Sequence, residues 1–211
     1  MKIESIRREY KRAELSEINM GEDPILFFEK WMKEALESTP EDATDVALST
    51  HGTDGFPQSR IVLLKHYNAD GFVFFTNYNS QKGRAIEKDP RVGLHFFWPK
   101  LERQIRITGF AEKTSTHISD EYFHSRPFES QVAAAVSEQS SEIPDRQFLE
   151  EKFEKLKSSL GEKNPDRPDN WGGYLVRPEK IEFWQGRENR LHDRIVFEKN
   201  GKSWKIKRLA P

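Results

Sequence analysis

The chain has 211 residues, of which 35% are apolar and 33% charged, and its formal net charge is −1. This length suits a single domain with its own core, and the near-zero charge argues against a dedicated nucleic-acid-binding protein. Because there is no cysteine, disulfides, thiolate nucleophiles and cysteine-ligated metals are excluded, and redox chemistry would need a bound cofactor.

The first predicted helix follows an N-terminal arm. Residues 2–12 are mixed in charge with few apolar positions, which indicates a mobile arm or a solvated helix. Asp23 and Pro24 then supply an N-cap and a first helical position. Apolar residues recur at helical spacing before Pro40: Ile25, Phe28, Trp31, Met32, Ala35 and Leu36.

From residue 45 the pattern changes to strands separated by short turns. The expected strands are 46–50, 58–67, 72–77, 91–98 and 101–113, with a short helix at 80–88. Successive strands joined by short turns predict an antiparallel meander that closes into a barrel or a sandwich.

The second half is predicted to be helical and then to return to strands. Helices are expected at 117–124, 127–138 and 144–160, followed by a polar linker over 161–170. The last expected strands are 173–176, 180–185, 191–198 and 203–208, the final pair being joined by an Asn200–Gly201 hairpin turn.

Two short segments place cations where an anion could bind. In residues 59–65, four apolar residues separate Arg60 from Lys65. This favours either an inner strand with solvated ends or an apolar strand under a flat ring with an anion nearby. Residues 80–84 begin a helix, where Ser80 and Lys82 could hold a phosphate or form part of an ordinary helix start.

A strand over residues 103–109 would carry polar side chains on one face. Gln104, Arg106 and Thr108 alternate with two isoleucines. Such a face suits the hydrogen-bonding edge of a heteroaromatic ring, although exposure to solvent explains the same alternation.

Tyr122, Arg126 and Ser130 are each four residues apart. They would share one side of a helix if Pro127 only kinks it, and together they could bind a phosphate. The alternative is a helix boundary at Pro127 with Arg126 in solvent.

Arg190, His192 and Arg194 would point the same way if residues 190–194 form a strand. Two cations and an imidazole on one face repel one another unless an anion or an electron-rich ring faces them. An exposed edge strand also accounts for the charges, but accounts less well for the aromatic pair Phe183 and Trp184 just upstream.

Taken together, these segments resemble the pyridoxamine/pyridoxine 5'-phosphate oxidase family over nearly the whole chain. The most specific pieces are Arg60–Lys65, His124–Pro127 with Ser130, Ser137–Ser140, Glu182–Gly186 and Arg190–Arg194. The resemblance implies a mainly β protein with peripheral helices (α+β), an antiparallel split β-barrel, that forms a homodimer with FMN at the subunit interface. It further implies that residues 1–20 are an arm closing over the site, and that residues 21–211 are one FMN-binding domain with a helical insertion around 116–160.

The resemblance also implies roles for individual residues. Those expected to hold FMN are Arg60, Ile61, Val62, Leu63, Leu64, Lys65, Phe75, Thr76, Gln81, Lys82, Gln104, Gln139, Ser140, Trp184 and Arg194. Those expected to bind substrate are Arg7, Arg8, Glu9, Tyr10, Lys65, Tyr122, Arg126, Ser130, Arg190, Leu191 and His192. Arg190 and His192 are expected to be the catalytic residues.

The sequence departs from the family pattern at Gln81, where the family often has an arginine beside the lysine that contacts the FMN phosphate. Gln81 can donate a hydrogen bond but brings no charge. We therefore expect either weaker FMN binding or compensation by Arg84.

The implied activity is the FMN-dependent oxidation of pyridoxamine and pyridoxine 5'-phosphates to pyridoxal 5'-phosphate, a reaction of vitamin B6 biosynthesis and salvage. A hydride would pass from the 4' carbon to the flavin, which oxygen then reoxidises with release of hydrogen peroxide. The sequence indicates no preference between the two substrates.

Three other functions fit parts of the pattern: another split-barrel flavoprotein activity, a non-catalytic carrier of FMN or pyridoxal phosphate, and nucleic-acid binding. No metal site is expected, since the six histidines lack ligand spacing. With no apolar run near the ~20 residues of a membrane span and no signal peptide, we expect a cytoplasmic protein without membrane or nucleic-acid partners.

Overall fold

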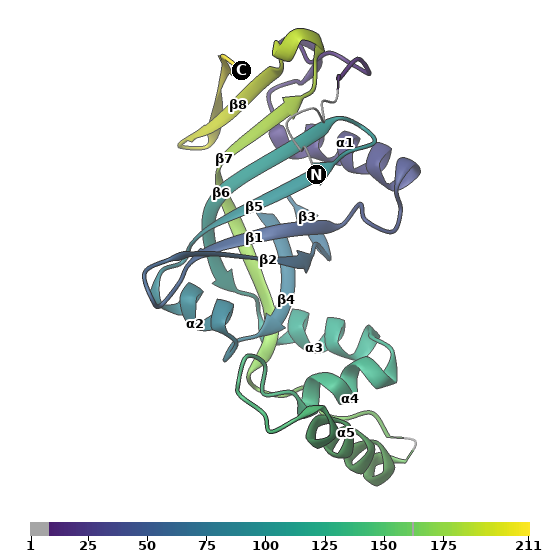
Figure 1. Ribbon diagram of the computed structural model, residues 1–211. Coiled ribbons are helices and arrows are strands. Elements are labelled where there is room, and N and C mark those ends of the chain that lie inside the picture. The colour runs from purple at the N-terminus through teal and green to yellow at the C-terminus, as the bar shows by residue number, and fades with distance from the viewer. Residues whose placement is uncertain (1–8, 162) are drawn as a thin grey trace.

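The computed structural model describes residues 9–161 and 163–211, which form a curled antiparallel sheet with helices at both ends (Figure 1). The strands are β1 (Asp45–His51), β2 (Pro57–Leu63), β3 (His66–Asn68), β4 (Gly71–Asn77), β5 (Arg91–Trp98), β6 (Arg103–Lys113), β7 (Trp171–Gln185), β8 (Asp193–Asn200) and β9 (Ser203–Leu209). The helices are η2 (Glu17–Asn19), α1 (Pro24–Ser38), α2 (Gln81–Lys88), α3 (Thr116–Ser125), α4 (Phe128–Val136), α5 (Arg146–Leu160) and η3 (Glu188–Arg190).

The sheet divides along β7. Its main path runs β2-β1-β5-β6-β7-β4-β3, and β8 and β9 branch from β7. The first part of β7, residues 171–176, pairs with β4, whereas residues 180–185 pair with β8. Every pairing is antiparallel. The predicted fold class, a mainly β split barrel with peripheral helices, is therefore confirmed.

A bulge allows β7 to continue where the sequence predicts two separate strands. The register of β6 against β7 shifts between Thr108 and Gly109, which face the segment containing Pro178. A Cβ on Gly109 would lie 2.0 Å from the carbonyl oxygen of Arg177, so only glycine permits this close approach.

Helix α1 covers the core at one end of the sheet (Figure 1). Asp23 caps it by accepting a hydrogen bond from the Ile25 N–H at 2.8 Å. Phe28 packs edge-on against Phe72 and Phe96, and Phe27 packs edge-on against Phe183 at 4.9 Å. The large rings thus supply much of the buried area. Phe27 is buried in place of the predicted Leu36, whose exposed fraction is 45%.

The helices α3, α4 and α5 lie together at the other end of the sheet, between β6 and β7 in the chain (Figure 1). Their bounds agree with the predicted helices to within about two residues. In the described part of the chain, no helix is long and apolar enough to cross a membrane.

The predicted strand over residues 191–198 begins later than expected. Glu188–Arg190 form the 3₁₀ turn η3, in which Asn189 and Arg190 have φ values of 55° and 62°. β8 starts at Asp193. The prediction that Arg190, His192 and Arg194 share a strand face is therefore wrong, because only Arg194 lies in a strand.

Candidate functional site

A cavity of about 790 Å³ lies between β2, β4 and the helices α2, α3 and α4. It has the size of a cofactor or substrate pocket. Twelve residues that the sequence analysis assigns to FMN or substrate line it: Arg60, Ile61, Val62, Leu63, Lys65, Phe75, Thr76, Lys82, Tyr122, Arg126, Ser130 and Gln139.

Arg60 and Lys82 form a cationic wall of this cavity. The Lys82 Nζ donates to the Thr76 hydroxyl at 3.2 Å and to Gln139 Oε1 at 3.3 Å. Arg60 donates to the Thr50 hydroxyl at 2.8 Å. Burial, helped by the charge of Arg60, lowers the pKa of Lys82 from 10.5 to about 8. Within the described residues neither cation has a carboxylate within 4.0 Å, so the pair is suited to an external anion.

Three aromatic rings form a second wall. Phe75 stacks on Tyr122 with ring centroids 4.0 Å apart, and on Trp171 at 5.7 Å. The guanidinium of Arg126 lies over the Trp171 ring at 4.8 Å. Its Nη1 is buried and has no hydrogen-bond partner among residues 9–161 and 163–211. An orphaned buried donor is costly, and an anionic ligand in the cavity would satisfy it.

The phosphate-binding group predicted on one helix is built from two. Helix α3 ends at Ser125, Arg126 adopts an extended conformation, and α4 begins at Phe128. The continuous helix was therefore a wrong prediction, and the alternative of a helix boundary at Pro127 is confirmed, except that Arg126 is partly buried and not in solvent. The buried Gln131 holds the junction, because its Nε2 donates to the carbonyl oxygen of Arg126 at 2.8 Å.

Gln104, Trp184 and Arg194 form a second group, away from this cavity. They are cross-strand neighbours on β6, β7 and β8, since Gln104 pairs with Trp184 and Trp184 with Arg194. Directly paired residues point to the same face of a sheet. His95 Nε2 lies 3.0 Å from Gln104 Oε1. None of these four residues lines the 790 Å³ cavity.

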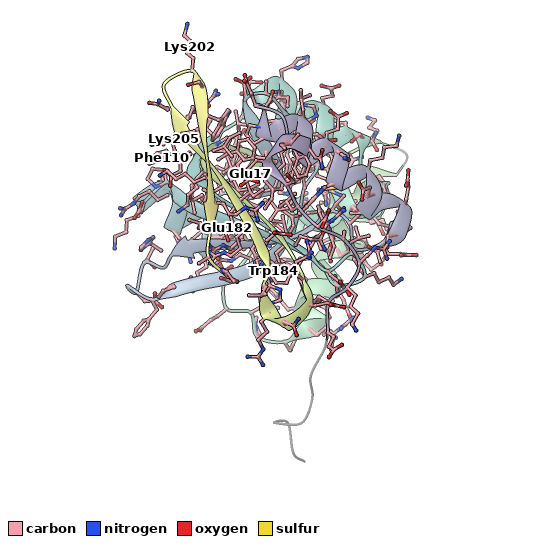
Figure 2. All side chains as sticks on the ribbon, turned by 90° about the horizontal axis from the view of Figure 1, so that it is seen from above. Glu17, Phe110, Glu182, Trp184, Lys202 and Lys205 are labelled. Carbon is pink, nitrogen blue, oxygen red and sulfur yellow. The ribbon has the colours of Figure 1, made fainter. Side chains whose placement is uncertain are left out.

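A buried carboxylate supports this row of side chains. Glu182, whose side chain is 5% exposed, accepts hydrogen bonds from Arg194 Nε at 2.9 Å and from Arg106 Nη2. Burial alone would raise its pKa, but the hydrogen bonds from Arg194 and Arg106 outweigh that effect and lower the pKa below its usual value. Figure 2 shows Glu182 and Trp184 along the β8–β9 hairpin, with Trp184 away from its Lys202 tip.

His192 belongs to the second group through its ring contacts. Its ring centroid lies 4.7 Å from that of Trp184 and 5.7 Å from that of Tyr10. Burial, then the charge of Arg190, lowers its pKa. Nδ1 accepts the Arg187 N–H at 3.1 Å, so the neutral ring carries its proton on Nε2. Arg190 itself is exposed.

The remaining predicted residues lie outside the cavity. Leu64 is buried in the core, Gln81 is exposed at the start of α2, and Ser140 and Leu191 are exposed. Arg84, the proposed compensation for Gln81, donates to the Asn79 carbonyl and does not line the cavity either. Glu9 is exposed and pairs with Lys11, and Arg7 and Arg8 lie outside the described residues.

Six further residues line the cavity without having been predicted as site residues: Asn77, Pro127, Ala133, Ala134, Ser137 and Trp171. Trp171 follows a polar linker, and no pattern in the neighbouring sequence predicts that its ring stacks on Phe75. The role of Glu182 could have been predicted, because it lies in the segment Glu182–Gly186, which is followed closely in the sequence by Arg190 and Arg194.

These walls fit a phosphorylated flat ring. Four cations line the cavity, Arg60, Lys65, Lys82 and Arg126, which is enough charge to hold two phosphates. The stacked rings offer a surface for a heteroaromatic ligand. The orphaned Arg126 Nη1 is the observation that most directly calls for an anion.

Comparison with known proteins gives two family matches. Residues 32–159 match the family model described as "Pyridoxamine 5'-phosphate oxidase". Residues 171–211 match the one described as "Pyridoxine 5'-phosphate oxidase C-terminal dimerisation region".

Several relatives are similar over their full lengths. A pyridoxine/pyridoxamine 5'-phosphate oxidase from Leptospira interrogans is 51% identical over 211 residues, covering 100% of this chain and 99% of that protein. One from Flavobacterium johnsoniae is 50% identical over 210 residues, covering 99% and 98%.

Two solved structures share the fold. PhzG from Burkholderia lata 383, in complex with tetrahydrophenazine-1-carboxylic acid, has a TM-score of 0.89 and 27% identity, covering 95% of this chain and 99% of that one. An FMN-binding protein from Nostoc punctiforme has a TM-score of 0.71 at 16% identity, covering 87% and 97%.

Proposed function

The chain belongs to the pyridoxamine 5'-phosphate oxidase family, and we propose that it oxidises pyridoxamine and pyridoxine 5'-phosphates to pyridoxal 5'-phosphate. The observation that carries the proposal is a cavity lined by four cations, one of which, Arg126, has a buried guanidinium nitrogen without a hydrogen-bond partner among the described residues. A phosphorylated cofactor and a phosphorylated substrate would supply the two anions. FMN, when bound, supplies the two-electron acceptor, which oxygen regenerates with release of hydrogen peroxide.

Arg60 and Lys82 would hold the FMN phosphate. The hydrogen bonds that Lys82 donates to Thr76 and Gln139 would keep its ammonium group in place. The apolar side chains Ile61 and Leu63, which are 62% and 44% exposed, would lie against the flavin ring. Burying this apolar area under a planar ligand favours binding.

The phosphate of the substrate would bind on the side of the cavity that carries Lys65, Tyr122, Arg126 and Ser130. Lys65 and Arg126 supply charge, and the hydroxyls of Tyr122 and Ser130 supply further donors. Fixing the phosphate at one end restricts the pyridine ring to one position and orientation, which converts binding energy into a lower activation barrier.

His192 and Arg190 would meet the substrate beside its reacting carbon. A lowered pKa keeps His192 neutral near pH 7, so it would donate a hydrogen bond from Nε2 and would not add a second cation beside Arg190. The Arg190 guanidinium would then hold the pyridine ring in position for hydride transfer.

We further infer that the protein acts as a homodimer in which FMN lies at the subunit interface. The group around Trp184 and Arg194 does not line the cavity of its own chain. Three of its residues, Trp184, His192 and Arg194, fall within residues 171–211, the part that matches a dimerisation region. In a symmetric dimer, this group of one protomer would complete the cavity of its partner.

A complementation experiment tests this arrangement. At substrate concentrations well below the wild-type KM, Arg126→Met and Arg190→Ala should each be nearly inactive, because each removes a residue from a different group. Refolding an equal mixture should restore about a quarter of wild-type activity, since half of the dimers would be mixed and each would carry one intact site. If the mixture stays inactive while mixed dimers form, the two groups act within one chain.

The activity itself is tested by supplying FMN and measuring peroxide formation with pyridoxamine 5'-phosphate, pyridoxine 5'-phosphate and their dephosphorylated forms. We expect peroxide and pyridoxal 5'-phosphate only from the phosphorylated compounds. Equal rates with unphosphorylated rings would favour a different flavoprotein activity, and binding of FMN without peroxide would favour a carrier.

A further inference from the structure

Glu102 occupies an unusual backbone position in the turn between β5 and β6. Its φ is 58°, in the left-handed region that favours glycine. The turn is closed by hydrogen bonds from the Leu101 N–H to the Trp98 carbonyl and from the Glu102 N–H to the Pro99 carbonyl. Glycine would adopt this conformation without strain, so the presence of glutamate here suggests that its side chain has a function.

The Glu102 carboxylate holds the N-terminal segment of the protein. Its Oε2 accepts hydrogen bonds from two successive backbone groups, the Lys11 N–H at 2.9 Å and the Arg12 N–H at 3.0 Å. Hydrogen bonds to a carboxylate are about twice as strong as neutral ones. These contacts span about 90 residues of sequence and fix the chain just after Tyr10.

The backbone of Glu102 is hydrogen-bonded to the residues on which Tyr10 rests. Its carbonyl oxygen accepts the Gly186 N–H at 2.8 Å and the Gln185 Nε2 at 3.2 Å. Gly186 is the surface on which Tyr10 rests, because a Cβ there would lie 2.6 Å from Tyr10 Cγ. One residue therefore fixes both the segment that carries Tyr10 and the backbone beneath its ring.

Tyr10 held in this way reaches the second group of the functional site. Its ring packs edge-on against Trp184, with centroids 5.6 Å apart, and against His192 at 5.7 Å. Trp184 is labelled in Figure 2 at the end of β7 from which this contact is made.

We propose that Glu102 is a positioning residue, which fixes the N-terminal segment so that Tyr10 stands against Trp184 and His192 beside the substrate. This inference rests on the proposed oxidase function. Held there, Tyr10 would cover the rings of Trp184 and His192 and help to exclude water from the bound substrate.

Other contacts also hold the segment: Arg12 Nη1 donates to the Lys100 carbonyl oxygen at 3.1 Å, and Lys11 Nζ pairs with Glu188 at 3.4 Å with both side chains more than half exposed. The Leu15 N–H donates to Asp193 Oδ2 at 3.0 Å, but it lies five residues beyond Tyr10. Glu14 pairs with Arg187 at 3.2 Å while its side chain is 79% exposed, and exposed ion pairs contribute little.

Three variants separate positioning from a general structural role. Glu102→Gly removes the carboxylate and at the same time relieves the backbone at φ 58°, so the turn is not weakened. Glu102→Gln keeps an acceptor oxygen for Lys11 and Arg12. Glu14→Ala is the matched control, because it removes an exposed contact of the same segment.

The first measurement is trypsin cleavage after Lys11 and Arg12, which needs no enzymatic activity. We expect Glu102→Gly to be cut about tenfold faster than wild type with an unchanged or higher Tm. Glu102→Gln should be cut within about twofold of the wild-type rate, and Glu14→Ala at the wild-type rate.

The second measurement is steady-state kinetics with FMN and pyridoxamine 5'-phosphate. Glu102→Gly should raise KM about tenfold, the equivalent of one charge-assisted hydrogen bond, with a smaller effect on kcat. Wild-type cleavage and unchanged KM in Glu102→Gly would overturn the proposal, as would a lower Tm and lower kcat at unchanged KM. If wild type oxidises neither phosphate, the proposed function fails, while the cleavage comparison still decides whether Glu102 holds the segment.

Discussion

The titration of Lys82 gives the sharpest prediction about cofactor binding. Its pKa is lowered from 10.5 to about 8, first by burial and then by the charge of Arg60. The ligand-free protein therefore carries a charged Lys82 at pH 7, whereas at pH 9 about one molecule in eleven does. A phosphate binds the charged form, so the Kd for FMN should rise about tenfold between pH 7 and pH 9.

The assay is a titration of FMN fluorescence quenching at several pH values and constant ionic strength, because salt screens exposed charges. The phosphate of FMN is already dianionic above pH 7, so the change reports the protein. Lys82→Arg is the matched control and should bind FMN with a flat profile, since a guanidinium stays charged. A flat wild-type profile from pH 7 to 9 would refute the reasoning.

The same shift has a consequence for stability without ligand. Since the folded pKa of Lys82 lies below its unfolded value, the charged side chain costs stability below about pH 8. That cost is relieved as pH rises from about 8 towards 10.5. Bound FMN should remove it at neutral pH, which calorimetry would record as a larger rise in Tm at pH 7 than at pH 9.

Further predictions concern the two groups of the site. Arg126→Met should raise KM for the phosphorylated substrate about tenfold to a hundredfold with no loss of Tm, because a buried unpaired donor disappears; an unchanged KM would contradict its role. Glu182→Gln should lower the free energy of unfolding by about 2 kcal/mol at pH 7, the contribution of a hydrogen bond to a charged group, measured by urea denaturation. Because the folded pKa of Glu182 is lowered, this difference should shrink as pH falls through that value; a constant difference would exclude the ionised pairing with Arg194. Gly186→Ala should push Tyr10 off Trp184 and change tryptophan fluorescence without a large change in Tm; an identical spectrum would count against the contact.

Local patterns predicted most of the elements but not the joins between them. The helix starts at Asp23 and Ser80 followed from their caps, which the structure contains. The long strand β7 was predicted as two, because Pro178 reads as a strand break and the bulge that accommodates it involves the distant Gly109. Such a long-range fit leaves no local signal.

The chemistry of the site was easier to predict than its geometry. Tyr122, Arg126 and Ser130 do line one cavity, but they reach it from two helices that meet at Pro127. The turn at Arg190 arises because Asn189 adopts the left-handed backbone conformation, which asparagine tolerates. The residues that follow it have the pattern of a strand, so the turn was not predicted. The row formed by Gln104, Trp184 and Arg194 depends on strand register, which one sequence does not specify.

The central claim is that this chain holds FMN and uses it to oxidise a phosphorylated B6 compound. It is tested most directly by the visible absorption spectrum of the protein loaded with FMN, recorded before and after anaerobic addition of pyridoxamine 5'-phosphate. We predict a flavin spectrum that bleaches with substrate and returns on admission of air. A bound flavin that is unchanged by either phosphorylated substrate, or a protein that takes up no FMN, would contradict the account.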